Sequence, residues 1–364
     1  MQSSLTGRAC RLNFKLTKSM LEQEIKLQLK DWKKIIKHYQ RPSRKRAWWQ
    51  VINTFGPFLG LWVLMYFSLS WSYWITIGLG LINGFFLARI FIIQHDCGHH
   101  SFLNSKAWNN IIGNFCSFFS TIPYKYWSKI HNYHHGHSGQ LEEAPRDIGD
   151  VPFLTVEEYR NLSRWGKLKY RLFRTPVVLF IVTPIVYLSG PMRWPTIKVP
   201  TVRNAYLALF LNNLWIGLVY AGLIYLLGWE FLWVQVPIIL FFGTIAFWFF
   251  YVQHQHEETY KKWKDEWDYL IAAIRGSTYY KLPRAFNWLT GNIGFHHIHH
   301  LSSLIPNYNL PRCARENPIL QKYVTTVTFK ESLTCIFNKL WDEQQERMIS
   351  FREYYRLERA GALG

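Results

Sequence analysis

The chain has 364 residues, and 42 lysines and arginines against 23 aspartates and glutamates give it a formal net charge of +19. Hydrophobic residues make up 49% of it and aromatic residues 18%, which argues against an ordinary pair of soluble domains and suits a protein bathed partly in lipid. No motif that reads RNA or DNA is visible, and nine basic residues between positions 26 and 46 directly precede a long apolar run, so we expect a membrane protein with no nucleic-acid partner.

The first fifty residues are predicted to form a cytosolic or interfacial segment with one amphipathic helix over residues 18–40. Such a helix suits the plane of the membrane surface, although packing on the protein itself is the alternative. No signal peptide is expected, and five cysteines without a CxxC pair fit a reducing compartment. The apolar residues of the helix recur at helical spacing with lysines between them: Leu21, Ile25, Leu29, Trp32, Ile35, Ile36 and Tyr39.

Four apolar runs are long enough to cross the hydrocarbon core, which takes roughly 20 helical residues. Tight turns join them into two hairpins, and the turns near Trp71 and Glu230 carry no lysine or arginine, whereas the flanking segments are basic. The positive-inside rule therefore places both termini in the cytoplasm. Two shorter apolar stretches, 111–122 and 177–190, are expected to be interfacial or re-entrant. The predicted spans cover residues 51–70, 72–94, 205–228 and 231–253.

Thirteen of the fourteen histidines fall in four short segments at or beyond the predicted cytoplasmic helix ends; only His38 stands apart, and no catalytic role is expected for it. The segments are HDCGHH (95–100), HNYHHGH (131–137), HQH (254–256) and HHIHH (296–300). Residues three and four apart share a helical face, so HxxxH, and HxxHH occurring twice, each project several imidazoles from one side. The candidate catalytic and metal-ligating residues are His95, His99, His131, His134, His135, His254, His296, His299 and His300.

Nine imidazoles are more than one metal ion needs and suit two ions with four or five ligands each. A zinc hydrolase usually uses three protein ligands and a water, so a dinuclear redox metal is the better hypothesis. Iron is the natural choice for activating O₂ against an unactivated C–H bond. The four histidines off the repeated pattern are expected to support the ligands or to lie on the surface: His100, His137, His256 and His297.

Other polar residues near the histidines or within the spans are weaker candidates. A metal-bound histidine usually donates its second N–H to a carboxylate or carbonyl, although turn capping is an equal alternative for Asp147 and Asp150. Buried polar residues in spans are often functional, but Arg89 and Asn213 could equally snorkel to the interface or pair between helices. The candidate orienting carboxylates are Asp96, Asp147, Asp150, Glu257 and Glu258.

Three of the histidine segments, HDCGH (95–99), HNYHH (131–135) and HHIHH (296–300), resemble the histidine boxes of membrane fatty acid desaturases. The similarity extends over about residues 45–345, through DIGDVPFLTVEEY (147–159), YVQHQHEETY (251–260) and LTGNIGFHHIHHLSSLIPNYNLP (289–311). The chain is similar to the acyl-lipid Δ12 (omega-6) branch more than to the acyl-CoA Δ9 branch, because three residues rather than four separate the histidines of the first box.

The resemblance implies an all-α integral membrane protein in which four transmembrane helices in two hairpins carry a cytosolic helical cap. The desaturase domain would cover residues 51–345, followed by a cytosolic tail, 346–364. The resemblance further implies a di-iron centre in the cap, held by the nine histidines, with O₂ as co-substrate. Electrons would come from a separate ferredoxin or cytochrome b5, since no HPGG motif is present. QHQHE departs from the common QHxFE form at His256, whereas His254 keeps the matching position.

The function implied is insertion of a cis double bond into a membrane-lipid acyl chain, most closely at the Δ12 position of an oleoyl-type chain. A narrow apolar tunnel, to which Trp127, Tyr133 and Phe295 are possible contributors, would fix the reacting carbon beside the metal. A hydroxylase, ketolase, acetylenase or desaturase of other regiochemistry on the same scaffold stays open. So does a transporter or metal sensor, although transporter spans are usually broken or polar near the midplane.

Overall fold

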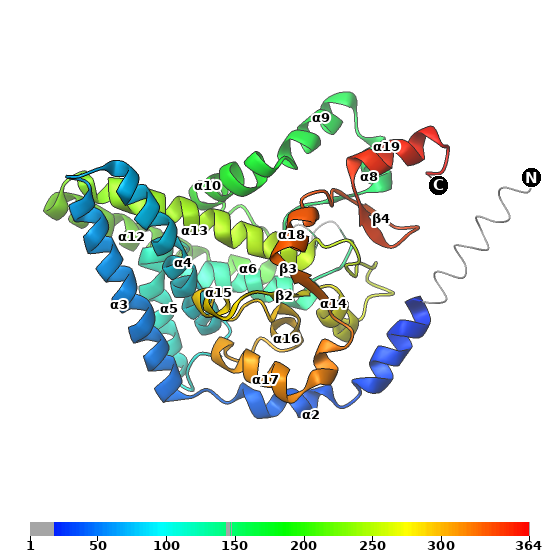
Figure 1. The fold of residues 1–364 in the computed structure, drawn as a ribbon, viewed down its shortest axis with the longest axis horizontal. Coiled ribbons are helices and arrows are strands. Elements are labelled where there is room, and N and C mark those ends of the chain that lie inside the picture. Colours follow the sequence, from blue (N-terminus) through cyan, green and yellow to red (C-terminus); the bar gives the residue numbers. More distant parts are fainter. Residues whose placement is uncertain (1–17, 143–145, 147, 364) are drawn as a thin grey trace, which may run out of the picture.

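Four long helices form one side of the molecule. The computed structural model describes residues 18–142, 146 and 148–363, and these four helices are long and apolar enough to cross a membrane. Helix α4 lies between α3 and α13, and short turns join α3 to α4 and α12 to α13 (Figure 1). The two predicted hairpins are therefore confirmed. The helices are α3 (Arg44–Ser68), α4 (Tyr73–Gly98), α12 (Tyr206–Leu227) and α13 (Glu230–His254).

The long helices extend beyond the predicted spans toward the histidines. Helix α3 begins at Arg44, where Ser43 accepts a hydrogen bond from the backbone N–H of Arg46 as an N-cap. Helix α4 continues past residue 94 through His95 to Gly98, and α13 ends at His254 itself. Two histidine segments are thus the ends of membrane-spanning helices, which fixes their depth relative to the lipid.

Both polar residues noted within the spans pair with neighbouring elements. The guanidinium of Arg89 donates to Thr54 Oγ1 (2.9 Å) and to the carbonyl of Trp288, and it stacks over the Trp288 ring at 4.1 Å. Asn213 accepts a hydrogen bond from Arg193 and donates to the Met192 carbonyl at 3.2 Å. Pairing between elements, one of the alternatives left open for these residues, accounts for the contacts of both.

The two shorter apolar stretches lie against the long helices. Helix α5 (Lys106–Ser120) contains most of the first and packs along α4. The second forms the π-helix η2 (Val178–Val182) and α10 (Thr183–Ser189), both in contact with α13. The preceding helix α9 (Arg164–Phe173) meets this unit at a 64° bend, so the pair is either a broken span or a re-entrant loop.

The cap consists of short helices and two small sheets at the other end of the molecule (Figure 1). Strands β2 (Thr278–Lys281) and β3 (Thr325–Thr328) pair in parallel, and β4 (Leu340–Asp342) pairs with β1 (Leu154–Thr155) and β5 (Arg347–Ile349). The helices are α6 (Tyr124–His137), α8 (Val156–Asn161), α11 (Pro200–Arg203), α14 (Tyr269–Arg275), α15 (Arg284–Leu289), α16 (His296–Leu301), α17 (Leu310–Glu316), α18 (Phe329–Cys335) and α19 (Phe351–Arg359), with short η1 (His38–Gln40), η3 (Asn307–Asn309) and η4 (Pro318–Gln321).

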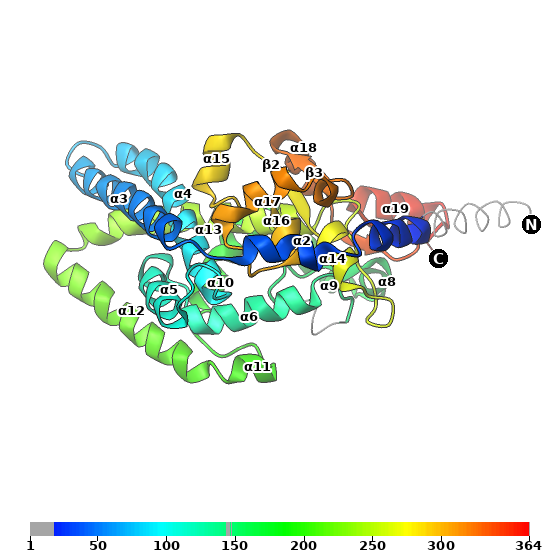
Figure 2. The same ribbon diagram turned by 90° about the horizontal axis from the view of Figure 1, so that it is seen from below.

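The N-terminal segment forms two helices instead of the single helix predicted over residues 18–40. Residues 18–28 are helical, turns occupy 29–31, and α2 (Trp32–Lys37) follows and leads into η1. Ile25, Leu29, Ile36 and Tyr39 are all buried in one cluster with residues of α14, α16 and α17. A straight helix could not bring all four onto the curved cap, so the chain bends. Figure 2 shows α2 lying across the cap. The apolar stripe thus packs on the protein, the alternative noted from the sequence.

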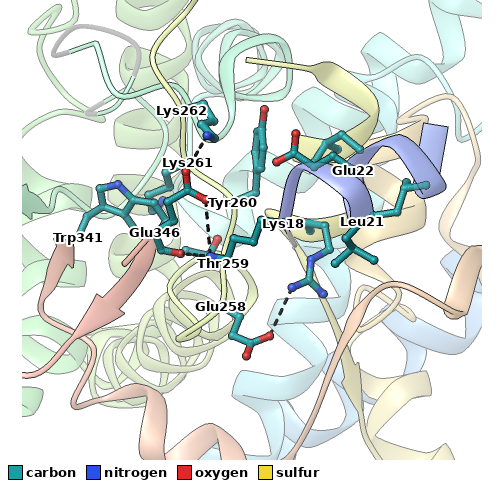
Figure 3. Close-up of a pocket in the computed structure, with 13 residues that line it drawn as sticks. Lys18, Leu21, Glu22, Glu258, Thr259, Tyr260, Lys261, Lys262, Trp341 and Glu346 are labelled. Atoms are coloured by element: carbon teal, nitrogen blue, oxygen red, sulfur yellow. Dashed lines mark hydrogen bonds and ion pairs between the residues drawn. The ribbon is translucent and has the colours of Figure 1, made fainter. Parts of the chain in front are cut away.

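Glu346, in the turn between β4 and β5, links the N-terminal helix to the segment 258–262 through a hydrogen bond and an ion pair. Lys18 donates to the carbonyl oxygen of Glu346 at 2.6 Å, and Lys262 donates to a carboxylate oxygen of the same glutamate at 2.8 Å. These residues border a small polar hollow of about 40 Å³ between the N-terminal helix, the 258–262 segment and the C-terminal hairpin (Figure 3). The β4–β5 hairpin crosses the boundary expected at residue 345, and Tyr354 of α19 is fully buried.

Candidate metal centre

Four helices bring the nine predicted histidines together. The end of α4 supplies His95, with His99 at its C-cap, and the end of α13 supplies His254. The two HxxHH segments fold as α6 and α16, so each presents its imidazoles on one face, as the spacing predicts. All nine residues are buried, with at most 8% of their surface exposed. A set of nine buried histidines requires a common polar partner, since burial of unpaired polar groups is costly.

The nine histidines divide into two neighbouring groups. The five-histidine cluster is His95, His99, His131, His135 and His299, each offering one ring nitrogen within 4.8 Å of the others. The four-histidine cluster contains His134, His254 and His300, which satisfy the same criterion, and His296, whose Nε2 lies 2.9 Å from Nε2 of His254. The rings of His135 and His300 stack at 4.2 Å, so the two clusters share a wall.

The nitrogen geometry fits two metal ions. Two ligands bound at about 2.1 Å and at right angles stand about 3.0 Å apart. Nε2 of His254 lies 2.9 Å from Nε2 of His296 and 3.3 Å from Nε2 of His134. The Nε2 atoms of His131 and His135 are 3.1 Å apart. The buried Nε2 atoms of His99 and His299 have no hydrogen-bond partner among the residues that the structure describes. More ring nitrogens converge here than there are hydrogen-bond donors to satisfy them, so a shared cation suits each cluster. Two clusters therefore suit two metal ions.

Burial keeps the candidate ligands neutral. It lowers the pKa of His134 to about 4 and holds the pKa of His131, His135, His299 and His300 well below the ordinary value, with neighbouring imidazoles adding to the effect. Only the neutral imidazole has a lone pair for a metal, so these sites are ready to bind one at neutral pH without first releasing a proton.

Partners behind the rings hold several candidate ligands in position. Nδ1 of His95 lies 2.9 Å from Asp96 Oδ1, and the second oxygen of Asp96 accepts two hydrogen bonds from Asn307, from its backbone N–H (2.6 Å) and its side chain (2.8 Å). Nδ1 of His99 lies 2.8 Å from Asn132 Oδ1. Such bonds leave Nε2 with the lone pair that faces the cluster. The sequence pointed to Asp96 but not to Asn132 or Asn307, because amides carry no comparable signal.

The other described carboxylates form no hydrogen bond or ion pair with a clustered histidine, although Asp150 lies near enough to His134 for its charge to oppose the lowering of the His134 pKa by burial. Asp150 accepts a hydrogen bond from the N–H of Val151, as turn capping would have it. Glu257 pairs with Arg347 at 3.0 Å and Glu258 with Arg275 at 3.4 Å, both at the surface. Asp147 lies outside the described residues. Of the four described acids, Asp96 is therefore the one that contacts a clustered histidine.

The histidines off the pattern have other partners. Nε2 of His256 lies 3.2 Å from the Arg275 carbonyl, and Nε2 of His297 lies 2.9 Å from Gln321 Nε2. The rings of His137 and Tyr133 stack at 4.0 Å, so Tyr133, which was suggested for the tunnel, packs against His137 instead. His100 is exposed. Of the two histidines in QHQHE, His254 thus joins a cluster and His256 does not.

An apolar cavity of about 380 Å³ runs from the five-histidine cluster toward the long helices. Its lining includes His131 and the rings of Phe91, Trp127, Phe247 and Phe250. A smaller cavity of about 80 Å³ continues past Phe91, Trp127 and Phe250 and reaches both clusters, at His95 and His131 of the first and at His296 of the second. We call the pair the acyl cavity. Trp127 lines both parts and stacks on His131 at 4.5 Å, whereas Tyr133 and Phe295 line neither.

Comparison with known proteins agrees with this arrangement. The family model described as "Fatty acid desaturase" matches residues 72–330. A "Fatty acid desaturase" of Bacillus subtilis is 42% identical over 92% of this chain and 94% of its own length. An "sn-1 oleoyl-lipid 12-desaturase" of Anabaena variabilis is 28% identical over 81% of this chain and 85% of its own. An "sn-1 acyl-lipid omega-3 desaturase (ferredoxin)" of Synechocystis is 27% identical over 78% of each.

Proposed function

Because the chain belongs to the fatty acid desaturase family and is an oxidoreductase built as a four-span helical membrane protein, we propose that its nine clustered histidines bind two iron ions. The observation that carries this proposal is the division of nine buried imidazoles into adjoining groups of five and four. Bound there, the iron pair would supply the reductive activation of O₂ needed to remove two hydrogens from neighbouring methylenes. Two electrons and two further protons complete the balance, giving one alkene and two waters.

The residues of the acyl cavity position the chain and exclude water. Trp127 and Phe91 pack edge to face at 4.8 Å beside His131, and Phe250 lies 5.3 Å from His134 on the other cluster. An acyl chain held between these rings passes both histidine groups, so one pair of carbons is presented to the metals. The apolar walls also exclude bulk water from the reacting carbons.

The regiochemistry that we propose is Δ12, on an oleoyl-type chain. It is supported by the three-residue spacing of the first box and by two relatives named sn-1 oleoyl-lipid 12-desaturases, at 25% and 28% identity. Expression in a host without polyunsaturated lipids should yield a methylene-interrupted diene, identified by mass spectrometry of the total fatty acids. A new monoene made from saturated chains would refute Δ12, and a hydroxy acid carrying ¹⁸O from ¹⁸O₂ would identify a hydroxylase.

Iron is tested separately from regiochemistry. Protein purified after growth with ⁵⁷Fe should contain two irons per chain, and Mössbauer spectra should show nitrogen-rich coordination at both. Replacement of His131 or His299 by alanine should lower the iron content, because each removes a nitrogen from the five-histidine cluster. His38→Ala is the matched control, since His38 lies away from both clusters and contacts Tyr39. Zinc in place of iron in active enzyme would overturn the assignment.

We further propose that a separate ferredoxin or cytochrome b5 delivers electrons from the cytoplasm, where basic segments place the cap and both termini. The exposed face of α6 carries Lys125, Lys129 and Asn132 at helical spacing, and Asn132 bonds directly to His99. If an acidic carrier docked on this face, only the side chains of Asn132 and His99 would separate it from the metals. Lys125→Glu with Lys129→Glu should raise the half-saturating carrier concentration several-fold at low salt, whereas Lys169→Glu on α9 should not.

A further inference from the structure

A second cavity, of about 450 Å³, opens between α10, α12 and α13, and its lining contains no histidine. Its walls are mostly apolar, including Ile216, Ile239 and Leu240. One charged side chain, Arg193, lines it, together with the hydroxyl-bearing Thr121 and Tyr220. We call it the Arg193 cavity. An apolar groove among membrane helices with a single cation at its wall is unusual, because such a charge is costly without a partner.

The charge of Arg193 has no counter-ion in the part of the chain that the structure describes. Its guanidinium donates to Asn213 Oδ1 and to the Thr121 carbonyl, both of which are neutral. These two bonds orient the group but use two of its five N–H donors. The three remaining donors have no partner among the described residues, and they belong to a side chain that lines the cavity.

The surroundings of Arg193 are those expected where the headgroups of a bilayer begin. Its neighbour Trp194 is 64% exposed, as expected of an aromatic residue at a membrane interface. Asn213, which anchors it, lies seven residues after the first residue of α12, about 10 Å along that helix. An arginine side chain is long enough to keep its charge at the interface from that depth.

The loop that carries Arg193 separates the two cavities. Pro184 and Leu188 of α10 line both of them, while Pro191 and Ile197, on either side of Arg193 in the chain, line the acyl cavity. A lipid whose headgroup rests at Arg193 can therefore place one acyl chain along the Arg193 cavity and the other in the acyl cavity. This arrangement links headgroup recognition to the reacting chain.

We propose that Arg193 binds the phosphate of a membrane phospholipid and so selects phospholipids, rather than neutral glycolipids or diacylglycerols, as acyl-chain donors. Guanidinium groups pair with phosphate through two parallel hydrogen bonds, which a sugar or free hydroxyl cannot replace. Basic pockets between helices on the cytoplasmic side of a membrane are suited to anionic headgroups. The proposal rests on the proposed desaturation for its substrate role, but the binding itself does not require catalysis.

Binding is measured first, on iron-free and iron-loaded protein in detergent, by native mass spectrometry with dioleoylphosphatidylglycerol and monogalactosyl-dioleoylglycerol. The wild type should retain the phospholipid preferentially, and Arg193→Gln should weaken its binding tenfold or more. Arg203→Gln is the matched control, because Arg203 is exposed on α11 and does not line the cavity. Inorganic phosphate at 10 mM should not displace the lipid; displacement would mark a free-phosphate site and overturn the proposal.

A second pair of variants guards against misfolding of Arg193→Gln. A Cβ added at Gly217 or at Gly222 meets nothing within 4 Å, so leucine fits at either position of α12. Gly217 lines the Arg193 cavity and Gly222 does not. Gly217→Leu should therefore lower phospholipid retention several-fold, and Gly222→Leu should leave it unchanged. Equal effects of the two would refute binding in this cavity.

Turnover on vesicles then tests the substrate role. With Arg193→Gln, KM should rise about tenfold on phosphatidylglycerol vesicles, while kcat and KM on galactolipid vesicles should not change. Equal KM values of the wild type for the two lipids would refute headgroup selection even if desaturation persists. Normal lipid binding by protein that desaturates neither lipid would instead refute the proposed function and leave the binding site standing.

Discussion

Replacing Asp96 by asparagine removes one charge from behind the five-histidine cluster at almost no change in volume. The carboxylate is 1% exposed and holds three groups: His95 Nδ1 at one oxygen, and two N–H donors of Asn307 at the other. An amide has one acceptor oxygen and one NH₂ group. The asparagine must therefore lose either the hydrogen bond with His95 or the two hydrogen bonds from Asn307, depending on which way its amide turns.

If the NH₂ group faces Asn307, two buried donors lose their acceptor, at a cost of about 1–3 kcal/mol each. If it faces His95, only Nδ1 is affected, and this nitrogen must then accept a hydrogen bond. The proton of the imidazole moves to Nε2, the atom that faces the cluster, and the ring can no longer bind a metal there. The second arrangement keeps both Asn307 bonds and is the cheaper one, so we expect the fold to survive and the metal site to suffer.

The expected loss is about 10–100-fold in metal affinity, the usual effect of removing a residue that orients a histidine ligand. It corresponds to about 1.4–2.7 kcal/mol. Iron per chain is measured by mass spectrometry after dialysis against a series of buffered Fe²⁺ concentrations, and the apoprotein is unfolded thermally in parallel. Iron half-saturation should shift, while the apoprotein melting temperature should fall by only a few degrees.

Glu257→Gln is the control, because it also neutralises a carboxylate near a histidine segment but one that pairs with Arg347 at the surface. It should leave iron binding unchanged. If Asp96→Asn binds iron as tightly as the wild type and is fully active, Asp96 does not orient His95. If it unfolds with the loss of several kcal/mol, the amide has turned the other way and the argument from relative cost is wrong.

The remaining predictions concern the fourth histidine segment, acid stability and orientation. His254→Gln should abolish activity and lower bound iron, while His256→Gln should stay within a few-fold of the wild type; the reverse result would exchange their roles. Because the folded pKa of His134 is about 4, below that of an unfolded histidine near 6.5, the folded apoprotein binds fewer protons between these values. The contribution of His134 to the stability of the apoprotein is complete above pH 6.5 and falls by about 3 kcal/mol as the pH drops toward 4. Urea unfolding of the apoprotein at a series of pH values measures this fall. A free energy of unfolding that does not change over this range would contradict the prediction. In sealed cells, a cysteine at Ser70, exposed in the turn after α3, should react with an impermeant thiol reagent, and one at Asp265, exposed in the cap, should not; labelling of the latter would reverse the proposed orientation.

Local patterns predicted most of the site because its parts are local. The apolar runs gave the four spans, and HxxxH and HxxHH spacing gave the faces of α4, α6 and α16 before any tertiary contact was known. The spans and the helical faces depend on residues within one or two helical turns of each other, which is the range over which periodicity carries information. The family resemblance, by contrast, separated His254 from His256, because His254 keeps the matching position in QHQHE.

What the sequence did not predict depends on contacts between distant residues. Asn307 reaches Asp96 across 211 positions, and nothing in either segment marks the pair. The bend at residues 29–31 follows from the shape of the cap and not from a helix-breaking residue in LKD, where neither glycine nor proline occurs. The Arg193 cavity likewise arises where three separate helices meet, and the arginine itself precedes α12 in a loop without a motif.

The packing of the N-terminal helices on the cap has a consequence for biosynthesis. Ile25 and Leu29 leave the ribosome more than 260 residues before Ile298 and Leu310, yet all four are buried in one cluster. The hydroxyl of Tyr39 likewise cannot form its 2.8 Å hydrogen bond until Glu316 has been synthesised. The first apolar helix must therefore remain without its packing partners while both hairpins insert. Contacts of this sequence separation form slowly, so the back of α16 is covered, and its histidines are fixed, only after the chain has been made as far as Glu316.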